Sequence, residues 1–575
     1  MNQGGKRKMN TINNTRYDFE QLRQQIINQD KWRNDVFVVY PFEAGSGKSR
    51  ESQRFLGEMT KQYGFRALYV QRFVKDNQLQ ETVNRINEYA EKEVAVGITG
   101  EDNKSKKALK KAIEAQILVC SHSMYKQFCR GLHPELTNNR QILIIDERMD
   151  LVERFTVSIE DIGNLWGSFS LYKQGEIVEV LAELLKKKYY HYLPLIGSVN
   201  KKEMYYVDFK EDDFVKYQSA LDELISLVTD KNHKMLLMKV KNLIKSGGLF
   251  FENQFHSVED IRYVMLENNI ILDANGSFDA TYRFFNEMFS IQKQPPIFDY
   301  SQTILHHFEV KTGKGSLEKY ASFFQDSLEK IDFSCGSKIL FVTDKDSVDK
   351  VQEALLMKFA QMGDNLEEIE EHHNIKLETE YFGNIIGRND FRDFDKVVIL
   401  KTPNYSYIDY SMLYFYFQVL GGNSVGNIQV FEHEQVEAIR KSVVAGETYQ
   451  AIKRINRDLT KKADIYLFCG NQETVDMVLN QLQNVQYVKR EMTIENKRKK
   501  SDSERKEQSS FDKKVTLVQE ALVACAKKVS SIKKKEFREQ LGILDKHLFA
   551  KILKNLAPFL QANQIESHGQ QLIFK

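Results

Sequence analysis

One stretch near the start of the chain indicates the fold: Asp35-Val-Phe-Val-Val-Tyr-Pro-Phe-Glu-Ala-Gly-Ser-Gly-Lys-Ser49. Its first part is apolar and β-branched, which is typical of a buried strand. The strand leads into five turn residues: Gly45, Ser46, Gly47, Lys48 and Ser49. Glycines let backbone N–H groups converge on an anion, and a following helix presents its positive end there. The stretch therefore predicts a strand, a phosphate-binding turn and a helix.

Lys48 and Ser49 give this turn a more specific chemistry. A lysine at this position reaches the β- and γ-phosphates of a nucleoside triphosphate, and the serine hydroxyl reaches Mg²⁺. The longer pattern G-x-x-x-x-G-K-[ST] has glycine where this chain has Phe42, so only its second half is present. On this segment alone, an ordinary strand-to-helix turn with a surface lysine stays an alternative.

Length and composition bound the protein class. A chain of 575 residues exceeds one hydrophobic core, so roughly two to four domains are expected. No stretch approaches the ~18 consecutive apolar residues of a membrane span, and no apolar segment follows the basic start, so we expect a cytoplasmic protein without a membrane partner. The formal net charge of +2 neither supports nor excludes nucleic acid. The five cysteines are scattered without a C-x-x-C pair, which supports neither disulfides nor a metal cluster.

The chain alternates between two kinds of pattern. Short apolar runs such as 67–71, 117–120 and 142–146 predict strands covered on both faces of a parallel sheet, and a second series begins near 338. We predict an α/β fold with the following organisation: an N-terminal extension over 1–30, a first α/β domain over 31–150 and 246–300, a helical insertion over 151–245, a second α/β domain over 301–488, a charged linker over 489–512 and a small domain over 513–575.

The last segment predicts three helices and a hairpin. Helical spacing runs through 515–523 and 535–541, Asp545 is a suitable N-cap for a third helix, and 565–574 has a glycine at the centre of a hairpin pattern. Three helices followed by a hairpin resemble a winged helix-turn-helix. A small helical protein-docking module has a similar pattern and stays an alternative.

A second candidate element is the strand Ile142-Leu-Ile-Ile-Asp146, which is followed by Glu147. Ligands of a parallel sheet bind at the carboxyl ends of the strands, where the glycine-rich turn also lies. There Asp146 can hold Mg²⁺ together with Ser49, and Glu147 can polarise an attacking water molecule. The alternative is a solvated strand end.

A third candidate element is Gln450-Ala-Ile-Lys-Arg454-Ile-Asn-Arg457 in the second α/β domain. A spacing of three places Arg454 and Arg457 on one face of a helix, so both guanidinium groups can face one anion. Such arginines stabilise the charge of a transferring phosphoryl group. A solvated basic helix face is the alternative.

These elements resemble the motifs of the superfamily-2 helicases, which have two RecA-like domains, over about residues 30 to 480. The turn 45–49 resembles motif I, Asp146 and Glu147 resemble motif II, and Gln450, Arg454 and Arg457 resemble motif VI. Shorter segments are similar to the remaining motifs in the expected order: Tyr69-Val-Gln-Arg72, Gly97-Ile-Thr-Gly-Glu101, Val119-Cys-Ser-His122, Leu272-Asp-Ala-Asn275 and Gly387-Arg-Asn-Asp390. The chain departs from the common forms at Arg148 and Met149 after the acidic pair, at Asn275 and at Lys453.

The resemblance implies an ATP hydrolase in which ATP and Mg²⁺ lie between the two domains. It implies catalytic roles for Lys48, Asp146, Glu147, Gln450, Arg454 and Arg457, and nucleotide binding by the turn residues with Gly387 and Asp390. It implies nucleic acid as the partner, DNA in preference to RNA, and movement on or remodelling of DNA. A protein partner is expected at the helical insertion or the C-terminal domain. The alternatives are a nucleotide-switched DNA-binding regulator or replication-initiation factor, and an RNA helicase.

Overall fold

The computed structural model describes the following residues: 18–72, 77–100, 105–197, 202–209, 214–360, 365–385, 390–457, 459–497, 502–526 and 529–574. They form two compact units. We call residues 1–318 with 322–494 the core unit, and residues 319–321 with 495–575 the C-terminal unit. The predicted Gly387 lies outside the described residues.

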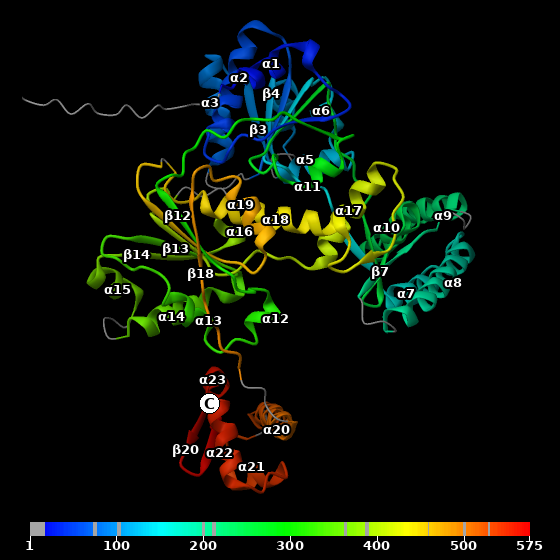
Figure 1. The fold of residues 1–575 in the computed structure, drawn as a ribbon. Helices are drawn as coiled ribbons and strands as arrows, with labels where there is room; N and C mark the ends of the chain where they lie inside the picture. Colours follow the sequence, from blue (N-terminus) through cyan, green and yellow to red (C-terminus); the bar gives the residue numbers. More distant parts are fainter. Residues whose placement is uncertain are drawn as a thin grey trace, which may run out of the picture. The chain divides into compact units, whose positions relative to one another are not determined.

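The first lobe of the core unit is a parallel sheet of seven strands in the order β11-β1-β10-β5-β2-β4-β3 (Figure 1). Its strands are β1 (Phe37–Tyr40), β2 (Ala67–Gln71), β3 (Ala95–Ile98), β4 (Ile117–Ser121), β5 (Ile142–Asp146), β10 (Asn268–Leu272) and β11 (Phe289–Ile291). All pairs within it run parallel. The predicted strands at 67–71, 117–120 and 142–146 are confirmed.

Apolar side chains leave both faces of this sheet, which explains the nearly continuous apolar runs. Val39, Leu68 and Ile145 enter one buried cluster, while Val38 and Tyr69 enter another. The covering helices are α1 (Glu20–Ile27), α2 (Lys48–Gln62), α3 (Gln78–Ala90), α4 (Lys106–Glu114), α5 (His122–Cys129), α6 (Pro134–Thr137) and α11 (Ala280–Phe284), with a short 3₁₀ turn η1 (Gln29–Lys31).

The second lobe is a parallel sheet of six strands in the order β14-β13-β15-β17-β12-β18. Its strands are β12 (Thr303–Phe308), β13 (Lys338–Thr343), β14 (Lys376–Tyr381), β15 (Lys396–Ile399), β17 (Ala463–Phe468) and β18 (Gln486–Arg490). Its helices are α12 (Lys314–Leu317), α13 (Phe323–Leu328), α14 (Val348–Lys358), α15 (Leu366–His373), α16 (Phe382–Ile385) and α19 (Gln472–Leu479), with a 3₁₀ turn η4 (Lys345–Ser347). The predicted fold class, α/β with two parallel sheets, is confirmed.

The insertion in the first lobe differs from the helical prediction. Four helices, α7 (Ile159–Ser168), α8 (Gly175–Tyr192), α9 (Phe214–Leu227) and α10 (Lys231–Ser246), are joined by the 3₁₀ turn η3 (Leu193–Gly197) and an antiparallel sheet. The sheet has the order β16-β7-β8-β9-β6 and contains β6 (Arg154–Val157), β7 (Glu203–Val207), β8 (Gly248–Phe251), β9 (Gln254–Val258) and β16 (Ile428–Gln429). The insertion therefore continues past residue 245, because β8 and β9 belong to it.

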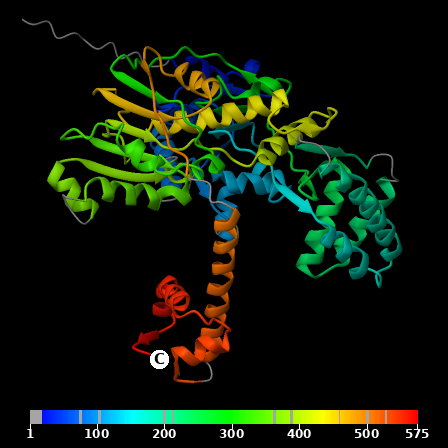
Figure 2. The same ribbon diagram turned by 60° about the horizontal axis from the view of Figure 1, so that its bottom comes forward.

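Two helices join the lobes. Helix α17 (Tyr407–Leu420) is buried almost all round, and its apolar residues belong to a cluster of the first lobe. Helix α18 (Glu434–Ile452), yellow in Figures 1 and 2, contributes Val436 and Ile439 to that cluster. The same helix contributes Ala445 and Tyr449 to the core of the second lobe. A single helix thus packs into both cores.

The C-terminal unit has its own core. Its elements are α20 (Asp502–Ala526), β19 (Ser531–Lys533), α21 (Lys534–Gln540), α22 (Lys546–Asn555), α23 (Ala557–Ala562), β20 (Ile565–His568) and β21 (Gln571–Phe574), and the sheet order is β19-β21-β20. The predicted hairpin is present, with Gly569 at φ +50° in its turn. Helix α20, the long orange helix in Figure 2, begins at Asp502 inside the predicted linker. That segment is rich in Glu, Lys, Arg and Gln, which have high helix propensity.

Among the described residues, none of the helices combines the length and the apolar character that crossing a membrane requires.

Candidate active site

The turn after β1 has the conformation that its glycines permit. Gly45 has φ +85° and Gly47 has φ +90°, a region that other residues rarely adopt. An added Cβ at either position meets no atom within 4 Å, so the space beside the turn is open. Helix α2 begins at Lys48, whose side chain is buried. The turn therefore leaves open space beside Gly45 and Gly47, next to the N-terminus of α2. Phosphate binding at this turn stays a prediction.

Asp146 stands at the carboxyl end of β5, between β2 and β10. The Tyr69 hydroxyl donates a hydrogen bond of 2.8 Å to its Oδ2, and its Oδ1 is buried without a hydrogen-bond partner. Burial raises the pKa of Asp146, while the charge of Lys48 and the hydroxyl of Ser49 lower it. A buried carboxylate oxygen with no donor, beside a serine hydroxyl, is the donor set that Mg²⁺ takes in triphosphate sites. Asp146 and Ser49 thus fit the predicted metal role.

Glu147 adopts φ +71°, which is unusual for a non-glycine residue. Its backbone N–H donates to the Leu272 carbonyl at 2.9 Å, and this contact with β10 fixes the turn after β5. Its carboxylate lies 3.7 Å from a guanidinium nitrogen of Arg72. Neighbouring His122 is half-buried with its Nε2 buried and unpaired, and its pKa is lowered to about 4 by burial and by Arg72, so it is neutral at physiological pH. Arg72, the last residue of the motif-like segment 69–72, here pairs with the carboxylate of Glu147 and orients it.

Motif VI differs locally from the prediction. Helix α18 ends at Ile452, so Gln450 is helical but Arg454 and Arg457 lie in the turns beyond. The prediction that the two arginines share a helical face is therefore wrong. The helix stops because Asn456 adopts φ +40° and is held by the backbone, donating its N–H to Phe394 and its side-chain amide to Lys461.

Arg454 nevertheless lies close enough to the first lobe for charges of that lobe to act on it. Its Nη2 donates to Gln450 at 3.3 Å, and its side chain is buried. The pKa of Arg454 is lowered to about 10 by burial and by the charges of Arg457 and Arg72, and raised by Glu147. Glu147 and Arg72 belong to the first lobe, so a cation of the second lobe lies within electrostatic reach of the acidic pair.

Lys453 occupies the position just before Arg454. Its Nζ is bonded to the Tyr300 hydroxyl and lies 4.1 Å from the ring centre of Phe298. Glu43, from the turn after β1, accepts backbone hydrogen bonds from Ile297 (3.0 Å) and Phe298 (3.2 Å). The segment that connects the lobes is therefore held between the turn after β1, through Glu43, and Lys453. In the sequence, Glu43 within the glycine-rich turn is the one residue that points to this contact.

Arg148 explains one departure from the family pattern. Its guanidinium pairs with Asp279 at 2.5 Å and with Asp150 at 2.9 Å, and lies 5.4 Å from the ring centre of Tyr282. The Tyr282 hydroxyl donates to Asp273 at 2.8 Å. A buried polar network thus connects the end of β5 with the segment after β10. The spacing of these residues in the sequence does not predict their contacts.

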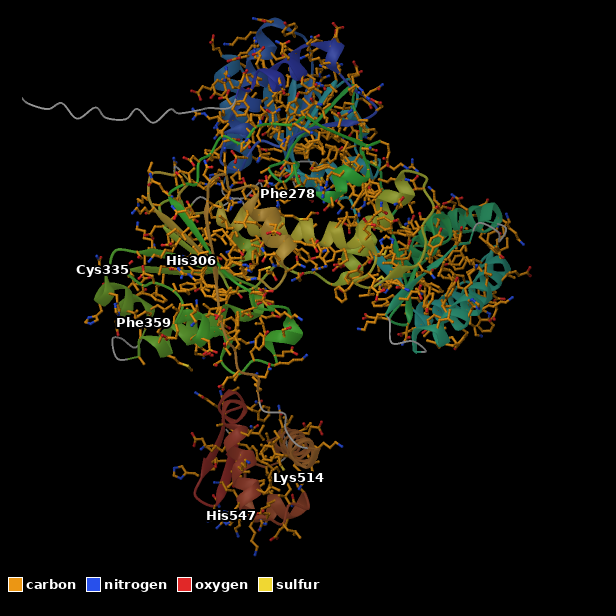
Figure 3. All side chains as sticks on the ribbon, viewed as in Figure 1. Phe278, His306, Cys335, Phe359, Lys514 and His547 are labelled. Atoms are coloured by element: carbon orange, nitrogen blue, oxygen red, sulfur yellow. The ribbon has the colours of Figure 1, made fainter. Side chains whose placement is uncertain are left out.

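Asn275 lies at the contact between the lobes. Its Oδ1 is buried without a hydrogen-bond partner, and its Nδ2 lies 2.9 Å from the position of a Cβ on Gly446 in α18. Ser442 of the same helix accepts a hydrogen bond of 3.1 Å from the N–H of Ala280. Phe278, labelled in Figure 3, packs on Tyr449 with ring centres 6.2 Å apart. We call residues 272–280 the motif III segment, because residues 272–275 are similar to motif III of the helicases. This segment therefore contacts α18 directly.

Ser121 and Asp390 belong to two further predicted segments. Ser121 accepts from the Met124 N–H and caps helix α5. Asp390 is exposed in a turn, and its role with Gly387 in nucleotide binding stays a prediction.

No protein-family model and no curated protein matches the sequence. Comparison with solved structures finds XPD in an apo form, at 13% identity over 82% of this chain and 100% of that chain, with a TM-score of 0.44. It also finds the DEAD-box helicase Mss116 bound to ssRNA and UDP-BeF, at 9% identity over 92% of this chain and 84% of that chain, with a TM-score of 0.37. A third is the Mycobacterium smegmatis helicase Lhr bound to ssDNA and AMP-PNP, at 11% identity over 94% of this chain and 56% of that chain, with a TM-score of 0.33.

Proposed function

We propose that this chain is a nucleic-acid-dependent ATPase, a helicase-like motor that couples ATP hydrolysis to movement on or remodelling of DNA. One observation carries the proposal. The charge of Glu147 in the first lobe acts on Arg454 of the second lobe, and Glu147, Lys48 and Ser49 all act on Asp146. Phosphoryl transfer requires these groups on one nucleotide.

The residues divide the chemistry between the lobes. Lys48 would bind the β- and γ-phosphates, and Ser49 with Asp146 would hold Mg²⁺, which neutralises developing charge when it is bound. Glu147, oriented by Arg72, would accept the proton of the attacking water. Arg454 and Arg457 would stabilise the charge on the transferring phosphoryl group. Because the arginines come from the other lobe, the ATP-bound state favours closure of the lobes.

ATP turnover with single-stranded DNA, single-stranded RNA or no nucleic acid tests this function. Lys48→Ala removes the phosphate-binding ammonium, and Glu147→Gln removes the base while keeping its shape, so each should lower turnover at least ~100-fold. The matched control is Lys61→Ala, near the far end of α2, where Lys61 pairs with exposed Glu91. It should turn over ATP like the wild type.

Two outcomes would contradict the proposal. One is turnover in Lys48→Ala and Glu147→Gln equal to that of the Lys61→Ala control. The other is turnover that neither DNA nor RNA stimulates. Stronger stimulation by RNA than by DNA would leave the ATPase assignment in place and make RNA the substrate. Contacts to the nucleic-acid backbone distinguish RNA from DNA only at the 2′-hydroxyl.

A further inference from the structure

The C-terminal unit contains a pocket that the proposed ATPase does not use. Its volume is about 560 Å³, within the range of sites that bind ligands. Helices α21, α22 and α23 and the turn of the hairpin β20–β21 line it. In Figure 3 the label of His547 marks the start of α22. The whole pocket lies within this unit.

The rim of the pocket is cationic. Five of its lining residues are basic and none is acidic: Lys534, Lys535, Arg538, Lys546 and Lys554. Lys534 donates to the Gly569 carbonyl at 2.7 Å, and Arg538 bonds to the carbonyls of Ile543 and Leu544. Lys535, Lys546 and Lys554 are exposed, and within the described part of the unit they have no ion pair. Three ammonium groups around one opening favour an anionic ligand.

The floor of the pocket is apolar. Phe549 and Leu553 of α22 and Leu560 of α23 contribute to it, and all three also belong to the core of the unit. Exposed Ala550 and Ala557 leave room above them, because their side chains are single methyl groups. An apolar floor of this kind takes leucine- or phenylalanine-sized side chains.

The geometry points to a docking site for an acidic peptide segment of a partner protein, with bulky apolar side chains in the pocket and flanking carboxylates on the lysines. Nucleic acid would bind the lysines of the rim but not the apolar floor. Phosphates would pair with the lysines, but bases stack on exposed aromatic faces, and the one aromatic lining residue, Phe549, is only 4% exposed. Apolar anchors ringed by carboxylates satisfy both the floor and the rim.

Fluorescence anisotropy with the full chain tests this site with defined probes. The first probe is a labelled peptide with leucine and phenylalanine at helical spacing between glutamates. The second replaces its leucines and phenylalanines by alanine, the third replaces its glutamates by lysine, and the fourth is a single-stranded oligonucleotide of mixed sequence. We expect the first to bind and the second and third to bind at least about tenfold more weakly.

Variants localise the binding. Lys546→Glu and Lys554→Glu should each lower the affinity for the first peptide about tenfold. Ala550→Glu should abolish its binding, because the glutamate side chain fills the pocket and adds a negative charge there. Lys513→Glu is the matched control, since exposed Lys513 on α20 does not line the pocket. Circular dichroism checks that each variant folds, and all four should retain the ATP turnover of the wild type.

Three results would overturn the site. Equal binding of the alanine-substituted peptide would show that the apolar floor is not used. Equal loss in Lys513→Glu and Lys546→Glu would show attraction by overall charge. Tighter binding of the oligonucleotide, with the same sensitivity to Lys546→Glu and Lys554→Glu, would identify the surface as a nucleic-acid site.

Discussion

Tyr69 shows how one hydroxyl sets the chemistry of a buried carboxylate. Its ring is fully buried, and its hydroxyl is the hydrogen-bond donor on Oδ2 of Asp146. Burial raises the pKa of Asp146, so metal binding, which needs the ionised form, weakens as the pH falls toward that raised value. The hydroxyl counteracts burial because a hydrogen bond to the charged form favours ionisation.

Tyr69→Phe should therefore raise the Mg²⁺ concentration needed for half-maximal ATP turnover by roughly tenfold, with the largest effect at low pH. Tyr125→Phe is the matched control, because the buried hydroxyl of Tyr125 donates instead to the Val264 carbonyl at 2.6 Å. It should lower stability similarly, by ~1 kcal/mol, and leave the Mg²⁺ requirement unchanged. An identical Mg²⁺ requirement in both variants would exclude a metal role for the Tyr69 bond.

Lys453 makes stability depend on pH in an identifiable window. Burial lowers its pKa to about 7, against an ordinary value of 10.5, although Glu43 raises it. Between these values the folded state holds a neutral amine while the unfolded state holds an ammonium, so unfolding takes up a proton. Stability therefore rises with pH from about 7 to about 10, and below about 7 the full cost of burying the charge remains.

Lys453→Met should remove this dependence. We expect a free energy of unfolding higher by ~1–4 kcal/mol at pH 7 and a flatter profile from pH 7 to 10, measured by urea unfolding at several pH values. The contrasting variant is Lys396→Met. Lys396 is equally buried but pairs with Asp332 at 2.7 Å, so its loss should destabilise the protein. A wild-type pH profile in Lys453→Met would assign the dependence to other groups.

At the scale of elements, α18 approaches the first lobe closely at Gly446. A methyl group there would lie 2.9 Å from the Asn275 amide, so Asn275 must move for alanine to fit. Gly446→Ala should separate α18 from the motif III segment, and we expect nucleic-acid stimulation of ATP turnover to fall about tenfold with nucleotide affinity unchanged. Steady-state turnover and nucleotide binding, measured side by side, separate the two effects.

Gly163→Ala provides the control for helix propensity. Gly163 lies within α7, and a Cβ there meets no atom within 4 Å. Alanine should stabilise this helix by ~0.5–1 kcal/mol without changing the stimulation. Reduced stimulation in both variants would show that the effect of Gly446→Ala does not come from the contact with Asn275.

The sequence predicts the elements whose causes are local. The central strands are covered on both faces, so each is a continuous apolar run such as 142–146, and the glycines at 45 and 47 directly mark the positive-φ turn after β1. Strands β8 and β9 were not predicted because they are short and pair antiparallel in a sheet whose edge strand, β16, lies far along the chain. The end of α18 was missed because no glycine or proline marks it; Asn456 stops the helix through contacts with distant backbone.

At the scale of the whole molecule, α18 gives the core unit a mechanical link. Its first half packs with the first-lobe cluster and its second half with the second-lobe cluster, and Gln450 lies in its last turn. Since protein interiors are close-packed, a shift of one cluster against the other must be taken up along this helix or at its ends. The turn that carries Arg454 follows α18 directly. A movement of the lobes that shifts α18 therefore also moves Arg454, with no surface loop between them.

The C-terminal unit has a separate core, which makes its contribution separable by truncation. Its buried cluster runs from Val518 to Phe574 and contains no residue of the core unit. A chain that ends at Lys497 retains the bridge between Tyr320 and Asn496 and loses α20 and everything after it. We expect the truncated chain to unfold at the same urea midpoint as the core unit of the wild type and to keep ATP turnover that single-stranded DNA stimulates.

If the C-terminal unit recognises a particular DNA site, as in a nucleotide-switched regulator, truncation should abolish that recognition alone. Loss of stimulated turnover in the folded truncated chain would mean instead that the core unit cannot engage nucleic acid by itself.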